Sequence, residues 1–296
     1  MKNDGTVWSW GDNTYGQLGD GGVLTSETEN PIQVSGVNGS KYLSDVVDIA
    51  SGTYFSIALL KNGNVVAWGL NNDGQLGNIG EISRKPVFVM DYNGNKLSGI
   101  VGISASRNHA IAVRADGTVF TWGSNDYGQL GNNTKTSSAY AIQVLDSTGN
   151  DYLKDVVQVS AGAAYVSVVK NDGTVWSWGA GASAQMGDGA RTQRSLPVQA
   201  KNVTDVKKVA TGCYITLVLK NDGTVWAWGL NRYGQLGIGV SSTSSSDANY
   251  VRTTAVQVKL NSTDYLTDVV DMGVMLMSTT CFAAGTGTSA VTQPLE

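Results

Sequence analysis

Histidine, cysteine and proline are scarce in this sequence. Its 296 residues include one histidine, two cysteines and four prolines. A single imidazole excludes histidine-rich metal sites and any mechanism that needs two imidazoles. Two cysteines are too few for a disulfide framework or a zinc cage. The sequence therefore predicts neither a metal site nor a cofactor.

Charged residues are also few, at 15% of the chain, and the net charge is −4. Strong binding to nucleic acid needs an excess of Lys and Arg, so no nucleic-acid partner is expected. No apolar run approaches the length of about 18 residues that a membrane-spanning helix needs, so no membrane insertion is expected. The first residues, MKNDG, lead into no apolar segment, so no signal peptide is expected in this chain.

Glycine and tryptophan, by contrast, recur in a fixed pattern. The dipeptide Trp-Gly occurs five times, at intervals of 50 to 58 residues, and each copy leads into a Gly-Gln-Leu-Gly block or a close variant of it. The five tryptophans are Trp10, Trp68, Trp122, Trp178 and Trp228. A two-part motif repeated at this spacing predicts a repeat protein in which each copy forms one supersecondary unit.

Each repeat contains four predicted strands. An Asp-Val-Val-like strand is followed by an apolar strand, an Asn-Gly or Asp-Gly turn, the tryptophan strand and a short fourth strand. Asn-Gly and Asp-Gly supply the positive φ angles of a type I′ hairpin, so the second and third strands should be antiparallel neighbours. Three of the four prolines are predicted to open a fourth strand. Proline is tolerated at a sheet edge, which predicts that the fourth strand is the outer one.

Repeated antiparallel units of this kind predict an all-β fold, a β-propeller of four-stranded blades. A β-solenoid is the alternative, but its coils are parallel and do not need the hairpin turn. The chain begins before a third strand and ends after a second strand, so five blades closed by pairing of the N- and C-terminal strands are expected. An open fragment of a seven-bladed propeller is the alternative. Residues 1–285 are predicted to form this single domain, followed by a degenerate tail at 286–296.

The repeat motif resembles that of the RCC1 (regulator of chromosome condensation) repeat family. Its best match is residues 106–131, which read SRNHAIAVRADGTVFTWGSNDYGQLG. The resemblance implies a β-propeller, usually seven-bladed, that works as a protein-binding platform. The founding member of the family is a guanine-nucleotide exchange factor that also docks on chromatin, and related propellers include a secreted bacterial inhibitor of β-lactamases.

The low charge of this chain and its loops rich in Ser, Thr and Asn resemble those of bacterial RCC1-repeat proteins. Those proteins are often segments of larger surface or secreted proteins. The resemblance therefore implies an extracellular or cell-surface location and a place within a larger multidomain protein.

The turn between the first and second strands varies in sequence among the repeats, and loops on a rigid frame commonly carry function. Equivalent positions in a propeller lie around one face, and Tyr and Arg are favoured interface anchors. We therefore predict a binding face for an unidentified protein partner. It is formed by Tyr54, Arg107, Tyr165 and Tyr214. A second set of tyrosines precedes the Gly-Gln block, at Tyr15, Tyr127 and Tyr233.

Other chemically interesting residues have structural interpretations. His109 occupies a position that Phe55, Tyr165 and Ile215 take in other repeats, which predicts a packing role. The Asp-Gly turns have neither the spacing of a calcium loop nor that of a phosphate loop, and turn chemistry explains them. Cys213 and Cys281 are predicted to be free thiols. Acidic residues form no visible pair, so no catalytic residue is assigned.

These observations favour a non-catalytic protein-protein interaction module. Two alternatives come from the family resemblance alone. One is guanine-nucleotide exchange on a small GTPase, and the other is inhibition of a secreted enzyme such as a β-lactamase.

Overall fold

A computed structural model describes residues 1–22, 27–274 and 280–285. These residues form twenty β-strands in six antiparallel sheets and contain no helix. Accordingly, no described segment is a helix long and apolar enough to cross a membrane.

Four of the sheets have four strands each, in the order of the sequence. The first is β3 (Val46–Ser51), β4 (Phe55–Leu60), β5 (Val65–Leu70) and β6 (Ile82–Phe88). The second is β7 (Ile100–Ser106), β8 (His109–Arg114), β9 (Val119–Gly123) and β10 (Ser138–Gln143). The third is β11 (Val156–Ala161), β12 (Tyr165–Lys170), β13 (Val175–Gly179) and β14 (Arg194–Gln199). The fourth is β15 (Val206–Thr211), β16 (Ile215–Lys220), β17 (Val225–Leu230) and β18 (Val251–Gln257).

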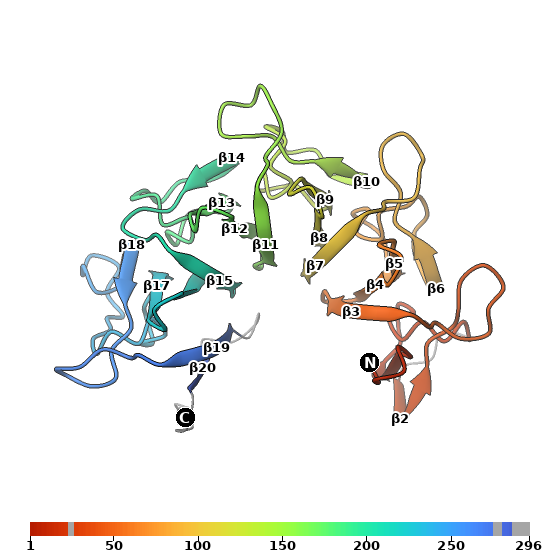
Figure 1. The fold of residues 1–296 in the computed structure, drawn as a ribbon, viewed down its shortest axis with the longest axis horizontal. Helices are drawn as coiled ribbons and strands as arrows, with labels where there is room; N and C mark the ends of the chain where they lie inside the picture. Colours follow the sequence, from red (N-terminus) through yellow and green to blue (C-terminus); the bar gives the residue numbers. More distant parts are fainter. Residues whose placement is uncertain (23–26, 275–279, 286–296) are drawn as a thin grey trace.

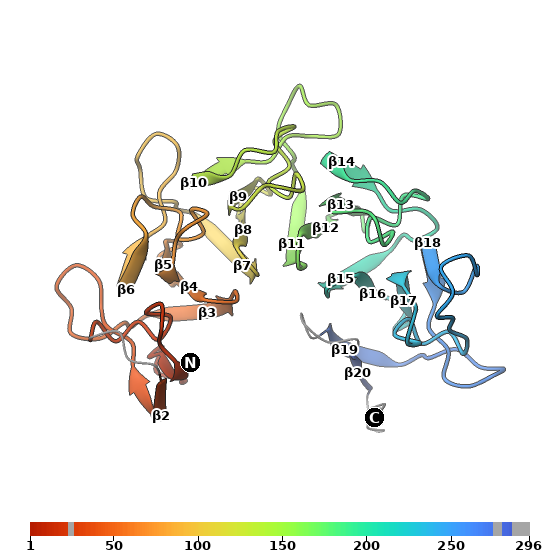
Figure 2. The ribbon, with the colours of Figure 1, turned by 180° about the vertical axis from the view of Figure 1, so that it is seen from behind.

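The sheets stand side by side around a common axis, as blades of a propeller (Figure 1). The first strand of each blade lies nearest the axis and the fourth strand lies outermost, in this view and in the view from behind (Figure 2). The structure therefore confirms the predicted β-propeller fold and the outer position of the fourth strand.

The first and last sheets of the chain have two strands each. One pairs β1 (Trp8–Asp12) with β2 (Glu27–Gln33), and the other pairs β19 (Val269–Val274) with β20 (Cys281–Gly285). These half-blades lie at the two ends of an open arc, so the predicted pairing of N- and C-terminal strands is not formed among the described residues (Figure 1). The described strands form an open arc, and the alternative that this arc is a fragment of a seven-bladed propeller stays a prediction. The predicted tail, 286–296, lies outside the described residues.

The hairpin between the second and third strands differs from the predicted type I′ turn. Only its glycine has positive φ, for example 76° at Gly173, whereas type I′ needs positive φ at both central residues. An aspartate stabilises the turn instead. Asp172 Oδ1 accepts hydrogen bonds from the Thr174 amide at 2.9 Å and from its hydroxyl at 2.6 Å. The Thr174 hydroxyl bond lowers the pKa of Asp172, because it favours the charged carboxylate.

The prolines lie inside the fourth strands rather than at their starts. Pro86 lies in β6, between Ser83, which pairs with Gly69, and Val87, which pairs with Ala67. The register shifts there, so the proline occupies a bulge on the outermost strand, where its missing N–H breaks no ladder bond. Pro31 and Pro197 lie in the equivalent strands β2 and β14.

The recurring tryptophan of the Trp-Gly dipeptide joins neighbouring blades in four of the five repeats. Trp178 is fully buried, and its indole N–H donates to the backbone carbonyl of Gln129 in the preceding blade at 2.9 Å. Trp68, Trp122 and Trp228 make the same bond to Gln17, Gln75 and Gln185. Trp10 is 63% exposed, since no described blade lies on its side of the first sheet. The tryptophan and the Gly-Gln block of the repeat motif thus form the contact between neighbouring blades.

Candidate functional site: the turn face

Two kinds of loop meet at one end of the blades. The turn from first to second strand lies beside the loop that follows the third strand of the preceding blade. Tyr54, in the β3–β4 turn, packs against Tyr15 of the preceding repeat with 4.8 Å between ring centroids and the ring planes tilted by 53°. At the equivalent place one blade further on, Asn108 donates to the Asp73 carboxylate at 2.8 Å. We call this end of the blades the turn face.

The turns themselves are linked along the arc by backbone hydrogen bonds. The Thr53 amide donates to the Arg107 carbonyl at 3.1 Å, and the Ala163 amide donates to the Gly212 carbonyl at 3.2 Å. Each bond joins turns of adjacent blades. Each of these four turns is therefore held by a backbone hydrogen bond to the turn of one neighbouring blade.

Arg107, Cys213 and Tyr214 form a cluster on this face, although they come from the second and fourth full blades. The Arg107 guanidinium lies 3.8 Å from the Cys213 sulfur. The Cys213 side chain raises the pKa of Tyr214, and the Arg107 charge opposes that shift. Tyr127 also affects Tyr214 electrostatically, which brings a tyrosine of the second set close to the first. The cluster thus combines a cation, a thiol and two half-exposed aromatic rings.

Three of the four predicted interface residues lie on the turn face. Tyr54 is 39% exposed, Tyr214 is 46% exposed and Arg107 is partly buried. Whether these residues bind a partner stays a prediction.

Tyr165 does not belong to the turn face, and its predicted exposure is wrong. It is the first residue of β12, pairs with Gly179, and has no exposed surface. Its hydroxyl donates to the Ile215 carbonyl and lies 3.2 Å from the Thr216 hydroxyl. The register shows why: Tyr165 matches Phe55, which pairs with Gly69, and the residue of its repeat that matches Tyr54 is the partly buried Ala164.

Tyr15 and Tyr127 are identified from the sequence, but as a set separate from the predicted binding face. The blade topology could have brought the two sets together, because the turn after the first strand and the loop after the third strand leave the sheet at the same end. The identities of the contacting pairs, such as Tyr15 with Tyr54, depend on how adjacent blades are rotated against each other.

His109 is a packing residue, as predicted. It is 1% exposed and pairs with Gly123, the register position that Phe55 and Tyr165 hold in their blades. Burial lowers its pKa from 6.5 to about 4, because the protonated ring loses its hydration. Its Nε2 and the Ser106 hydroxyl have no hydrogen-bond partner among the described residues. The imidazole is therefore neutral and sealed from any substrate.

The described residues offer no metal centre. Within 1–22, 27–274 and 280–285, no group of three or more His, Cys, Asp or Glu side chains is arranged to hold an ion. Both cysteines are free thiols, as predicted.

With this geometry established, sequence comparison decides the family. The sequence matches the RCC1-like domain over residues 1–293. The chain belongs to the RCC1-like domain family. It is 36% identical over 198 residues to the human probable E3 ubiquitin-protein ligase HERC6, a match that covers 66% of this chain and 18% of that protein. It is 31% identical over 209 residues to human HERC2, which covers 68% of this chain and 4% of that ligase.

Solved structures show the same fold for this RCC1-like domain. Human WBSCR16 superposes with a TM-score of 0.74 at 23% identity, over 95% of this chain and 71% of that one. Prp20p from Saccharomyces cerevisiae superposes with a TM-score of 0.71 at 22% identity, over 93% of this chain and 63% of that one. Since the chain spans 18% or less of its HERC relatives, the ligase activity in their names does not follow from the match.

Proposed function

We propose that this RCC1-like domain is a non-catalytic protein-interaction module whose turn face binds a protein partner. The observation that carries the proposal is the group of half-exposed aromatic rings and one guanidinium held on linked turns. Tyr and Arg are the residues most often found at the energetic centre of interfaces. Because the turns are joined between blades, the partner meets a preformed surface and little ordering is required on binding.

One of the fold relatives is described by what it binds, but this does not identify a partner for the present chain. The structural study of Prp20p concerns that protein's binding to Gsp1p and histones. Its 22% identity to this chain carries the fold alone, so those partners are not assigned here. The partner proposed for this chain is a folded protein, and the extracellular or cell-surface setting suggested by the sequence is part of the same proposal.

Alanine substitution on the turn face tests the function. After affinity capture of partners from the organism that encodes the chain, binding is measured by calorimetry or surface plasmon resonance. We expect Tyr54→Ala, Arg107→Ala and Tyr214→Ala each to weaken binding by about tenfold or more, the effect of losing an interface anchor.

Tyr152→Ala is the matched control, because Tyr152 is 47% exposed, close to the value for Tyr214, but lies at the opposite end of the blades. Equal losses of partner affinity in Tyr152→Ala and Tyr214→Ala would show that the partner does not bind through the turn face. Accelerated nucleotide release from a captured small GTPase would replace the proposal with the exchange-factor alternative.

A further inference from the structure

One connection between blades is much shorter than the others. Six residues join β14 to β15, against eleven or twelve in each of the other four connections from a fourth strand to the next first strand. Val203 is buried three residues before β15, as Leu153 is buried three residues before β11. The short connection therefore keeps its anchor in the core and lacks the outer part of the loop.

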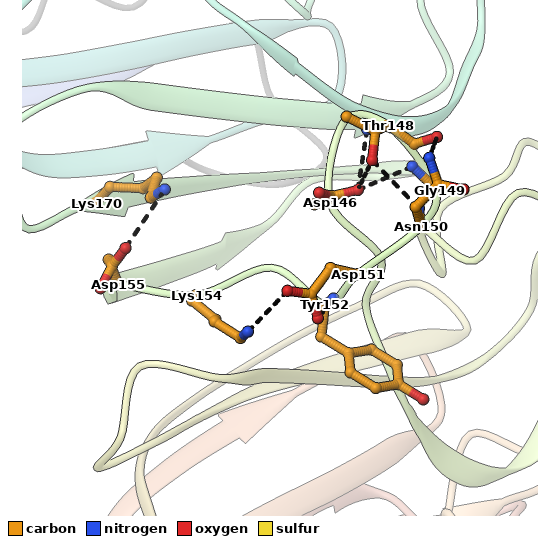
Figure 3. Close-up of polar contacts among 9 residues, drawn as sticks. All are labelled: Asp146, Thr148, Gly149, Asn150, Asp151, Tyr152, Lys154, Asp155 and Lys170. Atoms are coloured by element: carbon orange, nitrogen blue, oxygen red, sulfur yellow. Dashed lines mark hydrogen bonds and ion pairs between the residues drawn. The ribbon is translucent and has the colours of Figure 1, made fainter.

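The longer connections show what that outer part does. In the connection before β11, Leu145 and Tyr152 form an isolated β-bridge that closes the loop 146–151. Asp146 accepts bonds from the Thr148 hydroxyl and the Gly149 amide, and Asp151 pairs with Lys154 at 2.8 Å (Figure 3). At the loop tip, a Cβ on Gly149 would lie 3.2 Å from Leu196 of β14. The long loop thus covers the outer strands of the blade that it enters.

Where the loop is short, a cavity of about 610 Å³ lies between the connection and Trp226 of β17. Its lining residues are Gln199, Ala200, Lys201, Asn202, Val203, Thr204, Lys220 and Trp226. The volume falls within the range of small-ligand sites. Lys220 is the last residue of β16, whereas Tyr214 of the turn face directly precedes the first residue of this strand. The cavity therefore lies at the end of the blade opposite to the turn face.

The lining combines one aromatic surface with cations and neutral polar groups. The Trp226 indole N–H donates to the Thr224 hydroxyl at 3.1 Å, so this donor is already paired and the indole ring is what Trp226 contributes to the lining. Lys220 Nζ lies 5.9 Å from the ring centroid and 3.5 Å from the Asp222 carboxylate. Lys201 is exposed at the rim, and no described lining residue is acidic.

These groups match one ligand chemistry. A flat indole face suits the C–H surface of a pyranose ring, and the amides of Gln199 and Asn202 with the Thr204 hydroxyl suit its hydroxyl groups. The Lys220 ammonium is already paired with Asp222, so the Lys201 ammonium is the group that favours a ligand carboxylate, because charge-assisted hydrogen bonds are stronger than neutral ones. We propose that the cavity beside Trp226 binds a hexuronic acid unit, a pyranose that carries a carboxylate.

Titration of the intact chain tests this site independently of the turn face. Glucuronate and galacturonate are the probes, glucose is the neutral match, and binding is followed by calorimetry and tryptophan fluorescence. We expect a hexuronate to bind more tightly than glucose. Trp226→Ala should weaken hexuronate binding by about tenfold or more, the loss typical of an aromatic anchor. Lys201→Ala should reduce the preference for the acid over glucose.

Two variants control for fold and position. Trp176→Phe changes the equivalent residue of the blade that the long loop enters, and it should bind as the parent chain does. Replacing residues 200–205 with residues 144–155 should cover the cavity and abolish binding while the protein stays folded by circular dichroism. Absence of hexuronate binding, equal binding of glucose, full competition by inorganic phosphate, or unchanged binding in folded Trp226→Ala would each overturn the proposal.

Discussion

Trp178→Ala is expected to destabilise the protein by about 3–5 kcal/mol, the cost of removing a buried tryptophan from a packed core. The ring has no exposed surface and packs against the cluster that includes Val156, Val159 and Val168. The substitution also removes the indole donor and leaves the buried Gln129 carbonyl without it. The destabilisation should appear as a lower midpoint in chemical unfolding.

Trp10→Ala is the control for this prediction, because Trp10 holds the same repeat position and is 63% exposed. Its effect on stability should stay within about 0.5 kcal/mol, as for ordinary surface substitutions. Similar losses in the two variants would show that the tryptophan contributes within its own blade rather than between blades. Trp178→Phe should give an intermediate loss, since it keeps part of the apolar contact but removes the N–H donor and leaves a smaller void than alanine does.

Acidification is expected to destabilise the protein by about 3 kcal/mol between pH 6.5 and pH 4 through His109 alone. Burial lowers the folded-state pKa of His109 from 6.5 to about 4. In this window the unfolded chain takes up a proton that the folded chain does not, so stability falls as the pH falls. Each pH unit below 6.5 costs about 1.4 kcal/mol until the folded-state pKa is reached. Unfolding free energies measured across this range check the slope.

A double variant isolates the histidine from other titrating groups. Ser106 occupies the position of Gly52, where a Cβ would collide with the Phe55 ring. His109→Phe alone should therefore be strained by Ser106, whereas Ser106→Gly with His109→Phe recreates the Gly52–Phe55 pair. The double variant should lose the part of the pH dependence that His109 causes. A slope identical to that of the parent chain would assign the acid sensitivity to other groups.

The repeat motif explains why so much of the fold could be predicted. Trp68, Trp122, Trp178 and Trp228 recur with a Gly-Gln block because each indole bonds to a glutamine carbonyl of the preceding blade. Alternation along the strands and glycine in the hairpins are local properties, so strand number and order follow from the sequence. The exact turn type did not follow, because a glycine after an aspartate fits both a type I′ turn and a turn with positive φ at glycine alone.

The functional residues were harder to predict. Tyr165 and Tyr54 differ by one position in the repeat frame, and in a strand one position reverses the face of the side chain. Tyr165 therefore points into the core, while the partly buried Ala164 takes the turn position that Tyr54 holds in its repeat. The cavity beside Trp226 was not anticipated either, although the short connection before β15 was visible as a shorter repeat interval between Trp178 and Trp228.

The blade, its four antiparallel strands and the family follow from the amino-acid sequence, because these depend on short-range periodicity and turn residues repeated five times. Which residues from different blades meet depends on the packing of the whole fold. Arg107 reaches Cys213 across an intervening blade, and the half-blades β1–β2 and β19–β20 stay apart at the ends of the arc. Both outcomes depend on the rotation between adjacent blades, which the packing of whole sheets sets and no single repeat encodes.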